Sequence, residues 1–187
     1  MSSATGAARR RTARNKYKPD LIRCLLIAEA PPSEDGYFYF DDVGFADNLF
    51  TGTMGILFPT AFEGYVGQRS TQQKRSLLRS FQEKGFWLLD AVDSPLEHTA
   101  NATRIRVISD LESRLVRLRR SGEIDYSTPL IFMKANIYRA FYERLKEVGF
   151  NAIGQRVYFP GNGRQGEFRT MFPKALELAG YRKLRHD

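Results

Sequence analysis

The chain has 187 residues, 42% of them hydrophobic, which is enough for one compact domain with a sizeable core. No apolar run approaches the roughly 18 residues of a membrane span and no signal-like apolar stretch follows the N-terminus, so we expect an intracellular, cytoplasmic protein with no membrane partner. Lys and Arg number 29 against 21 Asp and Glu, a net charge of +8 that favours a polyanionic partner, with nucleic acid ahead of a membrane surface.

The first 15 residues carry Arg9, Arg10, Arg11 and Arg14 among small side chains, without a hydrophobic period. This composition predicts a basic disordered arm over residues 1–15 and a single domain over residues 16–187. Such an arm can add phosphate contacts without reading sequence. A solubilising tail is the alternative interpretation.

Residues 21–28 form an apolar run with the length and composition of a strand buried on both faces, as in a parallel sheet. The only cysteine, Cys24, lies in this run, which predicts a buried, unreactive thiol and excludes an internal disulfide. Pro31 and Pro32 cannot continue a sheet ladder, so the strand must end near Glu29. Ligands bind at the carboxyl ends of strands in open α/β sheets, which makes Glu29 the first functional candidate, with a solvated loop carboxylate as the alternative.

An aromatic run follows at residues 37–40. Four consecutive rings cannot all face one side of a strand, so we expect at least one of them to line a surface or pocket. Residues 41–71 alternate glycines with aromatic side chains, which predicts a short helix near residues 45–50 followed by irregular structure. Loops of this length in compact domains are often functional.

The rest of the chain alternates helical and strand patterns. We predict helices over 71–84, 101–120, 136–148 and 168–178, and strands over 86–92, 129–134 and 155–159. This alternation predicts an α/β fold of three layers, α/β/α, with a central four-stranded parallel sheet. Right-handed crossovers would bring Glu29, Asp90, Lys134 and Phe159 to one end of that sheet.

Separated carboxylates, an aromatic run and the basic glycine loop at residues 160–164 suit an extruded nucleobase whose phosphates are bound outside the pocket. Lys134 has an alternative interpretation as a strand-end lysine in a salt bridge.

Three segments carry a family resemblance. Ala28-Glu29-Ala30-Pro31-Pro32 resembles the first motif of the uracil-DNA glycosylase superfamily, in the branch that reads Gly-Glu-Ala-Pro-Gly. Residues 88–92 resemble that branch's strand ending in Asn-Ala-Val, and residues 159–163 fall where the superfamily carries its His-Pro-Ser loop. The resemblance covers most of residues 21–181 in the same order and spacing, and it implies a four-stranded parallel sheet between helices.

The resemblance also implies roles for individual residues. Glu29 matches the carboxylate that orients the attacking water or stabilises the sugar cation, and Phe40 or Tyr39 matches the ring that stacks on the base. Asp90 matches the Asn that reads the pairing edge of the base. The implied sets are Glu29 and Asp90 for catalysis, Ala30, Tyr39, Phe40, Asp90 and Phe159 for base binding, and Lys134, Asn162, Gly163 and Arg164 for DNA binding.

The chain departs from the family pattern in three places. Ala28 replaces a glycine, and Phe159 replaces the histidine that donates to the leaving base. The cysteines that hold an iron–sulfur cluster in the closest branch are missing, so we expect no cofactor and no metal. The loss of one donor costs on the order of 3–4 kcal/mol in such sites, which slows the reaction without abolishing it.

The change from Asn to Asp90 alters the expected base recognition. Asn offers one donor and one acceptor, whereas an ionised Asp only accepts and would repel a uracil carbonyl unless it is protonated or reached through water. We therefore expect a monomeric DNA glycosylase of base excision repair that removes uracil or related deaminated bases from single- or double-stranded DNA, with relaxed readout. The alternatives are a catalytically silent, glycosylase-like DNA-binding module and, less favoured by the basic charge, a hydrolase of free nucleotides.

Overall fold

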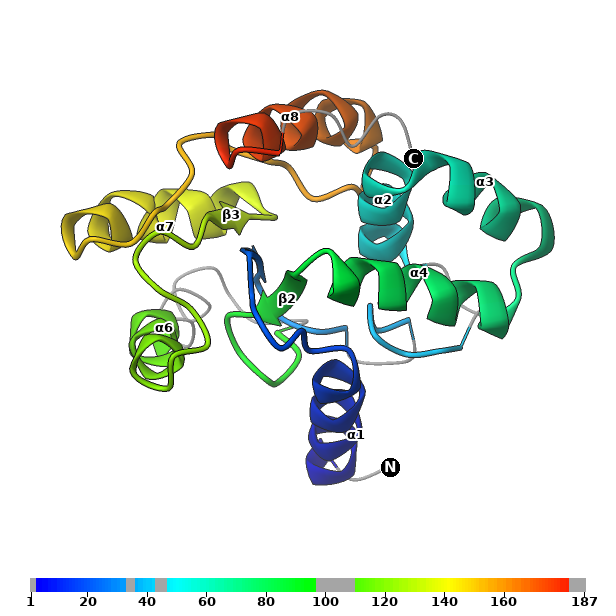
Figure 1. The fold of residues 1–187 in the computed structure, drawn as a ribbon, viewed down its shortest axis with the longest axis horizontal. Helices are drawn as coiled ribbons and strands as arrows, with labels where there is room; N and C mark the ends of the chain where they lie inside the picture. Colours follow the sequence, from blue (N-terminus) through cyan, green and yellow to red (C-terminus); the bar gives the residue numbers. More distant parts are fainter. Residues whose placement is uncertain (1–2, 33–35, 43–46, 97–109, 182–187) are drawn as a thin grey trace.

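The protein is an α/β structure built on a parallel sheet (Figure 1). The computed structural model describes residues 3–32, 36–42, 47–96 and 110–181. The strands β1 (Cys24–Ala28), β2 (Phe86–Asp90) and β3 (Leu130–Phe132) pair in the order β2-β1-β3, all parallel. Every strand residue is buried, as expected for a parallel sheet covered on both faces.

The register of the sheet aligns the ends of its strands. Ala28 pairs with Asp90, and Ile27 pairs with Phe132. The residues that follow the three strands therefore leave the sheet side by side, which is the arrangement expected at the carboxyl end of parallel strands.

The predicted four-stranded sheet is wrong for the described residues, because residues 155–159 do not form a strand. A single parallel bridge joins Leu130 to Ala152 instead, supported by a hydrogen bond of 3.0 Å from the Ile153 amide to the Leu130 carbonyl. β3 is an edge strand of only three residues, and its outer edge is bridged at Leu130 by Ala152, which precedes residues 155–159.

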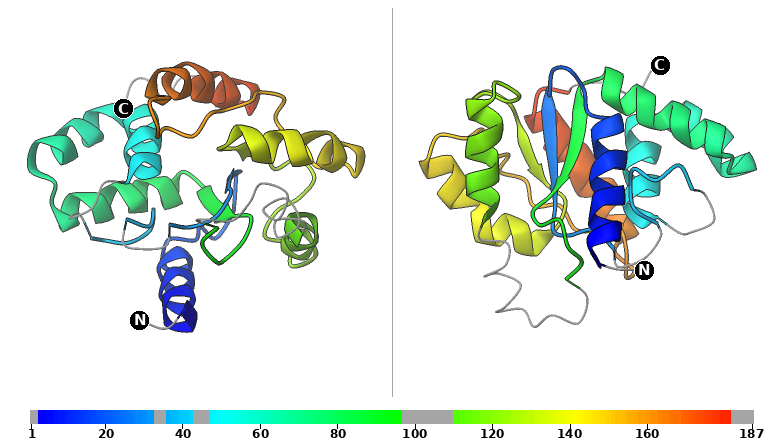
Figure 2. Two further views of the ribbon diagram at one scale, coloured as in Figure 1. Left: turned by 180° about the vertical axis from the view of Figure 1, so that it is seen from behind. Right: turned by 90° about the horizontal axis from the view of Figure 1, so that it is seen from below.

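Helices lie on both sides of the sheet. They are α1 (Ser3–Lys16), α2 (Asn48–Leu57), α3 (Pro59–Gln68), α4 (Thr71–Glu83), α6 (Leu111–Arg120), α7 (Ala135–Glu147) and α8 (Gln165–Leu178). The right-hand view of Figure 2 places α6 and α7 on one side of the strands and α1, α2 and α4 on the other. α8 packs against α2.

The helices predicted from periodicity and glycine terminators are confirmed for α4, α7 and α8. α4 begins with a capping box between Ser70 and Gln73, and Gly85 follows its end with a φ of +79°. Gly149 follows α7 with a φ of +89°. α6 covers the second half of the predicted helix at 101–120, and residues 101–109 lie outside the described residues.

The region predicted as a short helix and irregular chain contains two helices of 10 residues, α2 and α3. Asp47 caps α2, because its Oδ1 accepts a hydrogen bond of 2.9 Å from the Phe50 amide. Gly52, one of the glycines that suggested a loop, allows close packing instead. A Cβ on Gly52 would lie 3.0 Å from the Cβ of Pro160, so α2 approaches the loop before α8 closely at this point.

The predicted disordered arm is also wrong, because residues from Ser3 form α1. Arg10 and Arg14 are each only 8% exposed, and Arg14 Nη1 lies 3.0 Å from Asp93 Oδ1. Arginines rather than apolar side chains form the buried face of this helix. That is why the sequence shows no hydrophobic period there.

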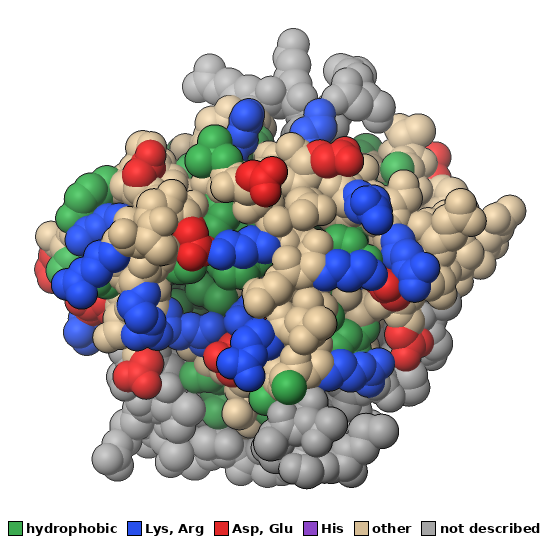
Figure 3. Space-filling model, turned by 60° about the horizontal axis from the view of Figure 1, so that its bottom comes forward, with side chains coloured by type: hydrophobic (Ala, Val, Ile, Leu, Met, Phe, Trp, Pro, Cys, Tyr) green, Lys and Arg blue, Asp and Glu red, His purple; other side chains and the backbone are tan. Residues whose placement is uncertain are grey.

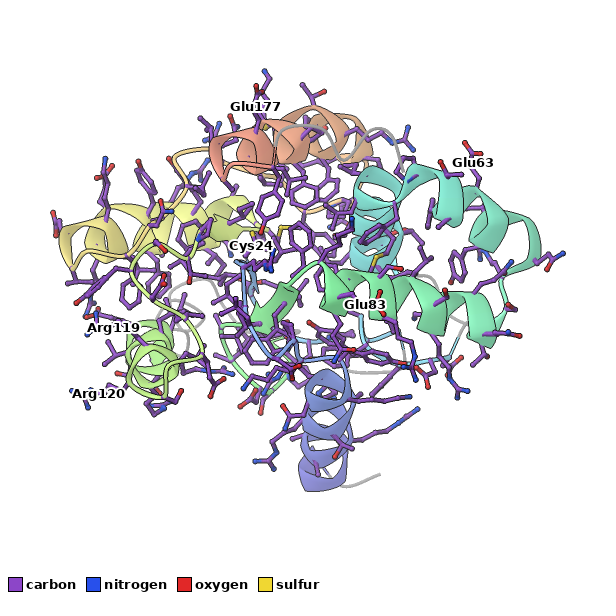
Figure 4. All side chains as sticks on the ribbon, viewed as in Figure 1. Cys24, Glu63, Glu83, Arg119, Arg120 and Glu177 are labelled. Atoms are coloured by element: carbon purple, nitrogen blue, oxygen red, sulfur yellow. The ribbon has the colours of Figure 1, made fainter. Side chains whose placement is uncertain are left out.

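The core surrounds the sheet. Cys24 is fully buried in the interior, as predicted, whereas Arg120 and Glu177 point outward from α6 and α8 (Figure 4). Burial raises the pKa of the Cys24 thiol, which keeps it protonated and unreactive. The face seen in Figure 3 carries Lys and Arg over much of its width, with Asp and Glu between them. In the part of the chain described, no helix is both long and apolar enough to cross a membrane.

Candidate functional site

A cavity of about 750 Å³ opens at the carboxyl end of the sheet. Its walls come from the residues after β1, the end of β2, the first turns of α2 and α7, and the loop at residues 158–164. The volume lies within the range of small-molecule sites, and the position is the one that a parallel sheet provides for ligands.

Glu29 lies in this cavity directly after β1 and is 6% exposed. Its Oε2 forms an ion pair with the Lys134 ammonium, and its Oε1 accepts a hydrogen bond from the Asn136 side-chain amide. Lys134 is the N-cap residue of α7, and Asn136 lies in the first turn of that helix. The start of α7 therefore fixes the orientation of the carboxylate. A carboxylate offers about four acceptor positions, and Lys134 and Asn136 occupy two of those of Glu29.

Asp90 is the last residue of β2, is 3% exposed and lines the same cavity. Burial raises the pKa of Asp90 to about 7, although the charges of Arg14 and Arg114 and a hydrogen bond with Tyr37 act in the opposite direction. Burial likewise raises the pKa of the Tyr37 hydroxyl, which stays a neutral donor. Near neutral pH the Asp90 carboxyl therefore exists as both neutral acid and carboxylate.

An arginine cluster holds the chain that follows Asp90. Asp93 Oδ1 lies 3.0 Å from Arg14 Nη1 and 3.1 Å from Arg114 Nη2, and Arg114 Nη1 donates to the Ala91 carbonyl at 2.9 Å. These contacts tie α1 and α6 to the end of β2. Both helices thus help to position the cavity wall that carries Asp90.

The predicted stacking rings are not where the resemblance placed them. Tyr39 and Phe40 are 1% and 7% exposed and lie outside the cavity wall, which contains Tyr37 and Phe38 instead. The Tyr39 hydroxyl accepts a hydrogen bond of 2.7 Å from the Leu88 amide, so this ring belongs to the sheet core.

The physical reason is a turn inside the aromatic run. The Phe40 amide donates to the Tyr37 carbonyl at 2.8 Å, which closes a turn and removes the alternation of a strand. The Arg9 guanidinium lies 4.1 Å from the centroid of the Phe40 ring, so α1 covers that ring on its outer side. The expectation that at least one ring of this run would line a pocket is confirmed by Tyr37 and Phe38.

The loop before α8 forms the opposite wall of the cavity. A Cβ on Gly161 would lie 2.8 Å from Cε1 of Phe159, so any larger residue at this position would force the ring to move. Asn162 follows with a φ of +54°. Gly163 lies outside the wall, whereas the other predicted residues of the loop and of the strand ends are together in it. Those residues are Glu29, Ala30, Asp90, Lys134, Phe159, Asn162 and Arg164.

Sequence reasoning missed Asn136 and Asp47. Asn136 stands two positions after Lys134 at the start of a predicted helix, which was a usable signal for a polar group near the strand ends. Asp47 lines the cavity beside its capping bond, and burial raises the pKa of its carboxyl to about 6. In the sequence, Asp47 has the position expected of a helix N-cap, which explains the residue without any functional role, so the sequence alone did not indicate a place in the cavity.

The described residues contain no group of three or more His, Cys, Asp or Glu side chains arranged to hold a metal ion. Comparisons of the chain with family models, with curated proteins and with solved structures found no match. The resemblance to uracil-DNA glycosylases therefore remains a prediction from the motifs.

Proposed function

We propose that the protein is a monofunctional DNA glycosylase that hydrolyses the N-glycosidic bond of uracil or a related deaminated base. The observation that supports this proposal best is the buried Glu29 carboxylate, held by Lys134 and Asn136 inside a cavity that also contains Asp90. A fixed carboxylate in a recess of this size suits a reaction at the sugar of an extruded nucleotide.

The reaction breaks the bond between C1′ and the base nitrogen, and water forms the new C1′–O bond. Glu29 would orient this water, accept its proton and stabilise the positive charge that develops on the sugar. The base leaves with the bonding electron pair and takes up a proton. Lys134 lies next to Glu29 and would add a positive charge close to the anionic leaving group.

Asp90 would read the base in its neutral form. A protonated carboxyl combines one O–H donor with an acceptor oxygen, which is the pattern that an Asn side chain offers. Uracil, hypoxanthine and xanthine all place a ring N–H next to a carbonyl, so the same contact fits each of them. The rings of Phe38 and Phe159 supply apolar walls for the base.

An excision assay tests this function directly. Oligonucleotides that carry uracil, hypoxanthine or xanthine are incubated with the full-length protein and then cleaved with alkali at abasic sites. We expect strand breaks at the modified base with the wild-type protein and nearly none with Glu29→Gln. Breaks that persist at the wild-type rate in the variant, or no breaks with any of the three bases, would contradict the proposal.

One observation favours a second candidate, a DNA-binding module without catalysis. Phe159 lies in the cavity wall where the resemblance places a hydrogen-bond donor to the leaving base, and a phenyl ring cannot donate. In this case the same oligonucleotides would bind in a salt-sensitive manner and yield no breaks.

A further inference from the structure

Tyrosine and arginine side chains continue outward from the rim of the cavity. We call Tyr138, Tyr142, Arg156, Tyr158 and Arg164 the tyrosine–arginine strip. Tyr158 and Arg164 line the cavity, whereas Tyr138 and Tyr142 lie along α7. The strip thus joins the candidate site to the outer surface of a helix.

The members of the strip form two groups of contacting side chains. The rings of Tyr138 and Tyr142 are stacked, with centroids 4.8 Å apart and planes within 13°. The guanidinium carbons of Arg156 and Arg164 lie 5.1 Å and 4.5 Å from the centroid of the Tyr158 ring. A Cβ on Gly154 would lie 2.9 Å from the Tyr142 hydroxyl oxygen, so the chain just before Arg156 passes beside the tyrosine pair, and Arg156 also acts electrostatically on the Tyr138 hydroxyl.

These rings differ from the other aromatic side chains near the cavity. Tyr37 and Phe38 are buried, whereas Tyr138, Tyr142 and Tyr158 are half-buried and Arg164 is exposed. The Tyr138 ring packs edge-on against the buried ring of Phe132, at a centroid distance of 5.9 Å. Supported rings that keep part of their surface in water are available to a partner.

Half-exposed tyrosines between guanidinium groups are the chemistry that binds unpaired bases and their phosphates. Lys146, whose ammonium lies 5.7 Å from the Tyr142 centroid, adds a further positive charge at the far end. A duplex keeps its bases stacked on each other, so it cannot offer them to these rings. We infer that the tyrosine–arginine strip binds the single-stranded DNA that flanks the nucleotide in the cavity.

This inference rests on the proposed function for the identity of the polymer, and it makes unpaired DNA the preferred substrate. The site would capture the target nucleotide with Glu29 and Asp90 while neighbouring bases stack on Tyr138 and Tyr142. Base-independent stacking would give tight binding with little sequence preference around the target.

Fluorescence anisotropy with the full-length protein tests the strip. The probes are a labelled oligothymidylate about 15 nucleotides long, an oligomer of equal length made of abasic sites, and a duplex of that length. We expect the wild-type protein to bind the oligothymidylate more tightly than either other probe. Tyr138→Ala should weaken oligothymidylate binding by about fivefold or more and leave binding of the abasic oligomer unchanged.

Three further variants sharpen the test. Tyr138→Phe retains the ring and should bind as the wild type does. Arg156→Gln should weaken binding of the oligothymidylate and the abasic oligomer alike and reduce the salt dependence, because it removes a phosphate contact. Tyr126→Ala is the matched control, since Tyr126 is 52% exposed under Arg119 but contacts the chain near Gly149 at the other end of α7.

The outcomes separate the strip from the proposed chemistry. Unchanged oligothymidylate binding in both Tyr138→Ala and Arg156→Gln would contradict the proposal that the strip binds single-stranded DNA. Duplex binding as tight as single-strand binding would contradict it as well. Excision that depends on Glu29 would survive that result. Conversely, the strip variants could behave as expected while the protein excises no base. That result would support single-strand binding by the strip and contradict the proposed glycosylase activity.

Discussion

Two carboxyl groups at the same end of the sheet have opposite surroundings. Glu29 follows Ala28, Ala28 pairs with Asp90, and the two acids are 6% and 3% exposed. Yet Glu29 faces an ammonium and an amide donor, whereas Asp90 faces a phenol in a setting that raises its pKa to about 7. Two similarly buried carboxyl groups at neighbouring strand ends therefore have different polar partners, because different elements pack beside them.

The difference follows from the order of the strands. β1 is central, so Glu29 lies beside β3 and receives Lys134 and Asn136 from the start of α7. Asp90 lies on the other side, where the arginines of α1 and α6 bind Asp93 rather than Asp90 itself. Paired acids in contrasting environments commonly divide the work of an active site, and the proposed function assigns the orientation of water to Glu29 and the reading of the base to Asp90.

The largest expected effect comes from removing the charge of Glu29. Glu29→Gln keeps the shape of the side chain but cannot take a proton from water, so the excision rate should fall by about 10²–10⁴-fold. Binding of the substrate oligonucleotide should change by no more than about threefold. Single-turnover excision with excess enzyme measures the first quantity, and anisotropy measures the second. A rate within tenfold of wild type would remove Glu29 from the mechanism.

The donors around Glu29 can be weakened without removing the carboxylate. Asn136→Ala removes the hydrogen bond to Oε1, and hydrogen bonds to charged groups are worth about 1.5–3 kcal/mol, which corresponds to about ten- to hundredfold in rate. Because Asn136 positions the carboxylate, kcat should fall while KM stays nearly constant.

Asn151→Ala is the matched control for this variant. Asn151 is exposed and donates to the Ser127 carbonyl at 2.8 Å, on a part of the chain outside the cavity wall. It should excise at the wild-type rate. Equal losses in both Asn variants would mean that the effect at Asn136 is one of stability rather than orientation.

The pH dependence should follow Asp90. Its folded pKa is raised from 3.8 to about 7, so the neutral acid that donates to a base carbonyl is present below about pH 7 and is lost above it. Uracil excision should therefore fall about tenfold for each pH unit above 7. The same sign applies to stability, because the contribution of Asp90 declines as pH rises from the unfolded to the folded pKa. Asp90→Asn should abolish this alkaline fall, and an unaltered profile in that variant would assign it to another group.

Much of the fold was predictable because local patterns agree with it. The apolar runs that became β1 and β2 are bounded by prolines, glycines or polar residues, and α4 and α7 combine helical periodicity with glycine terminators. The two large errors have non-local causes. Residues 155–159 have a strand-like sequence, but the short edge strand β3 is bridged by Ala152, which precedes them, and α1 is held by arginines that reach Asp93, far away in the sequence.

In the candidate site, too, some residues could be predicted from local sequence patterns and others depend on non-local packing. Glu29, Asp90 and Lys134 were predictable because each ends a buried run, and parallel strands bring those ends together. The family resemblance implied Tyr39 or Phe40 as the stacking ring, but the turn between Tyr37 and Phe40 places Tyr37 and Phe38 in the cavity wall instead. Single residues at strand ends can be read from the sequence, whereas the direction of a side chain in a turn depends on its packing.

The smallest expected effect tests whether α1 influences Asp90. Arg14→Gln removes the ion pair with Asp93, whose side chain is 58% exposed, so solvent screening limits the loss of stability to about 1 kcal/mol. Because the Arg14 charge opposes the raised pKa of Asp90, its removal should raise that pKa further. The midpoint of the alkaline fall in excision should then move to higher pH, and Arg11→Gln, which changes an exposed arginine of the same helix, should leave it in place. A midpoint that stays fixed in Arg14→Gln would mean that the contrast between the two carboxyl groups arises within the sheet and the cavity, with α1 serving only as a cover.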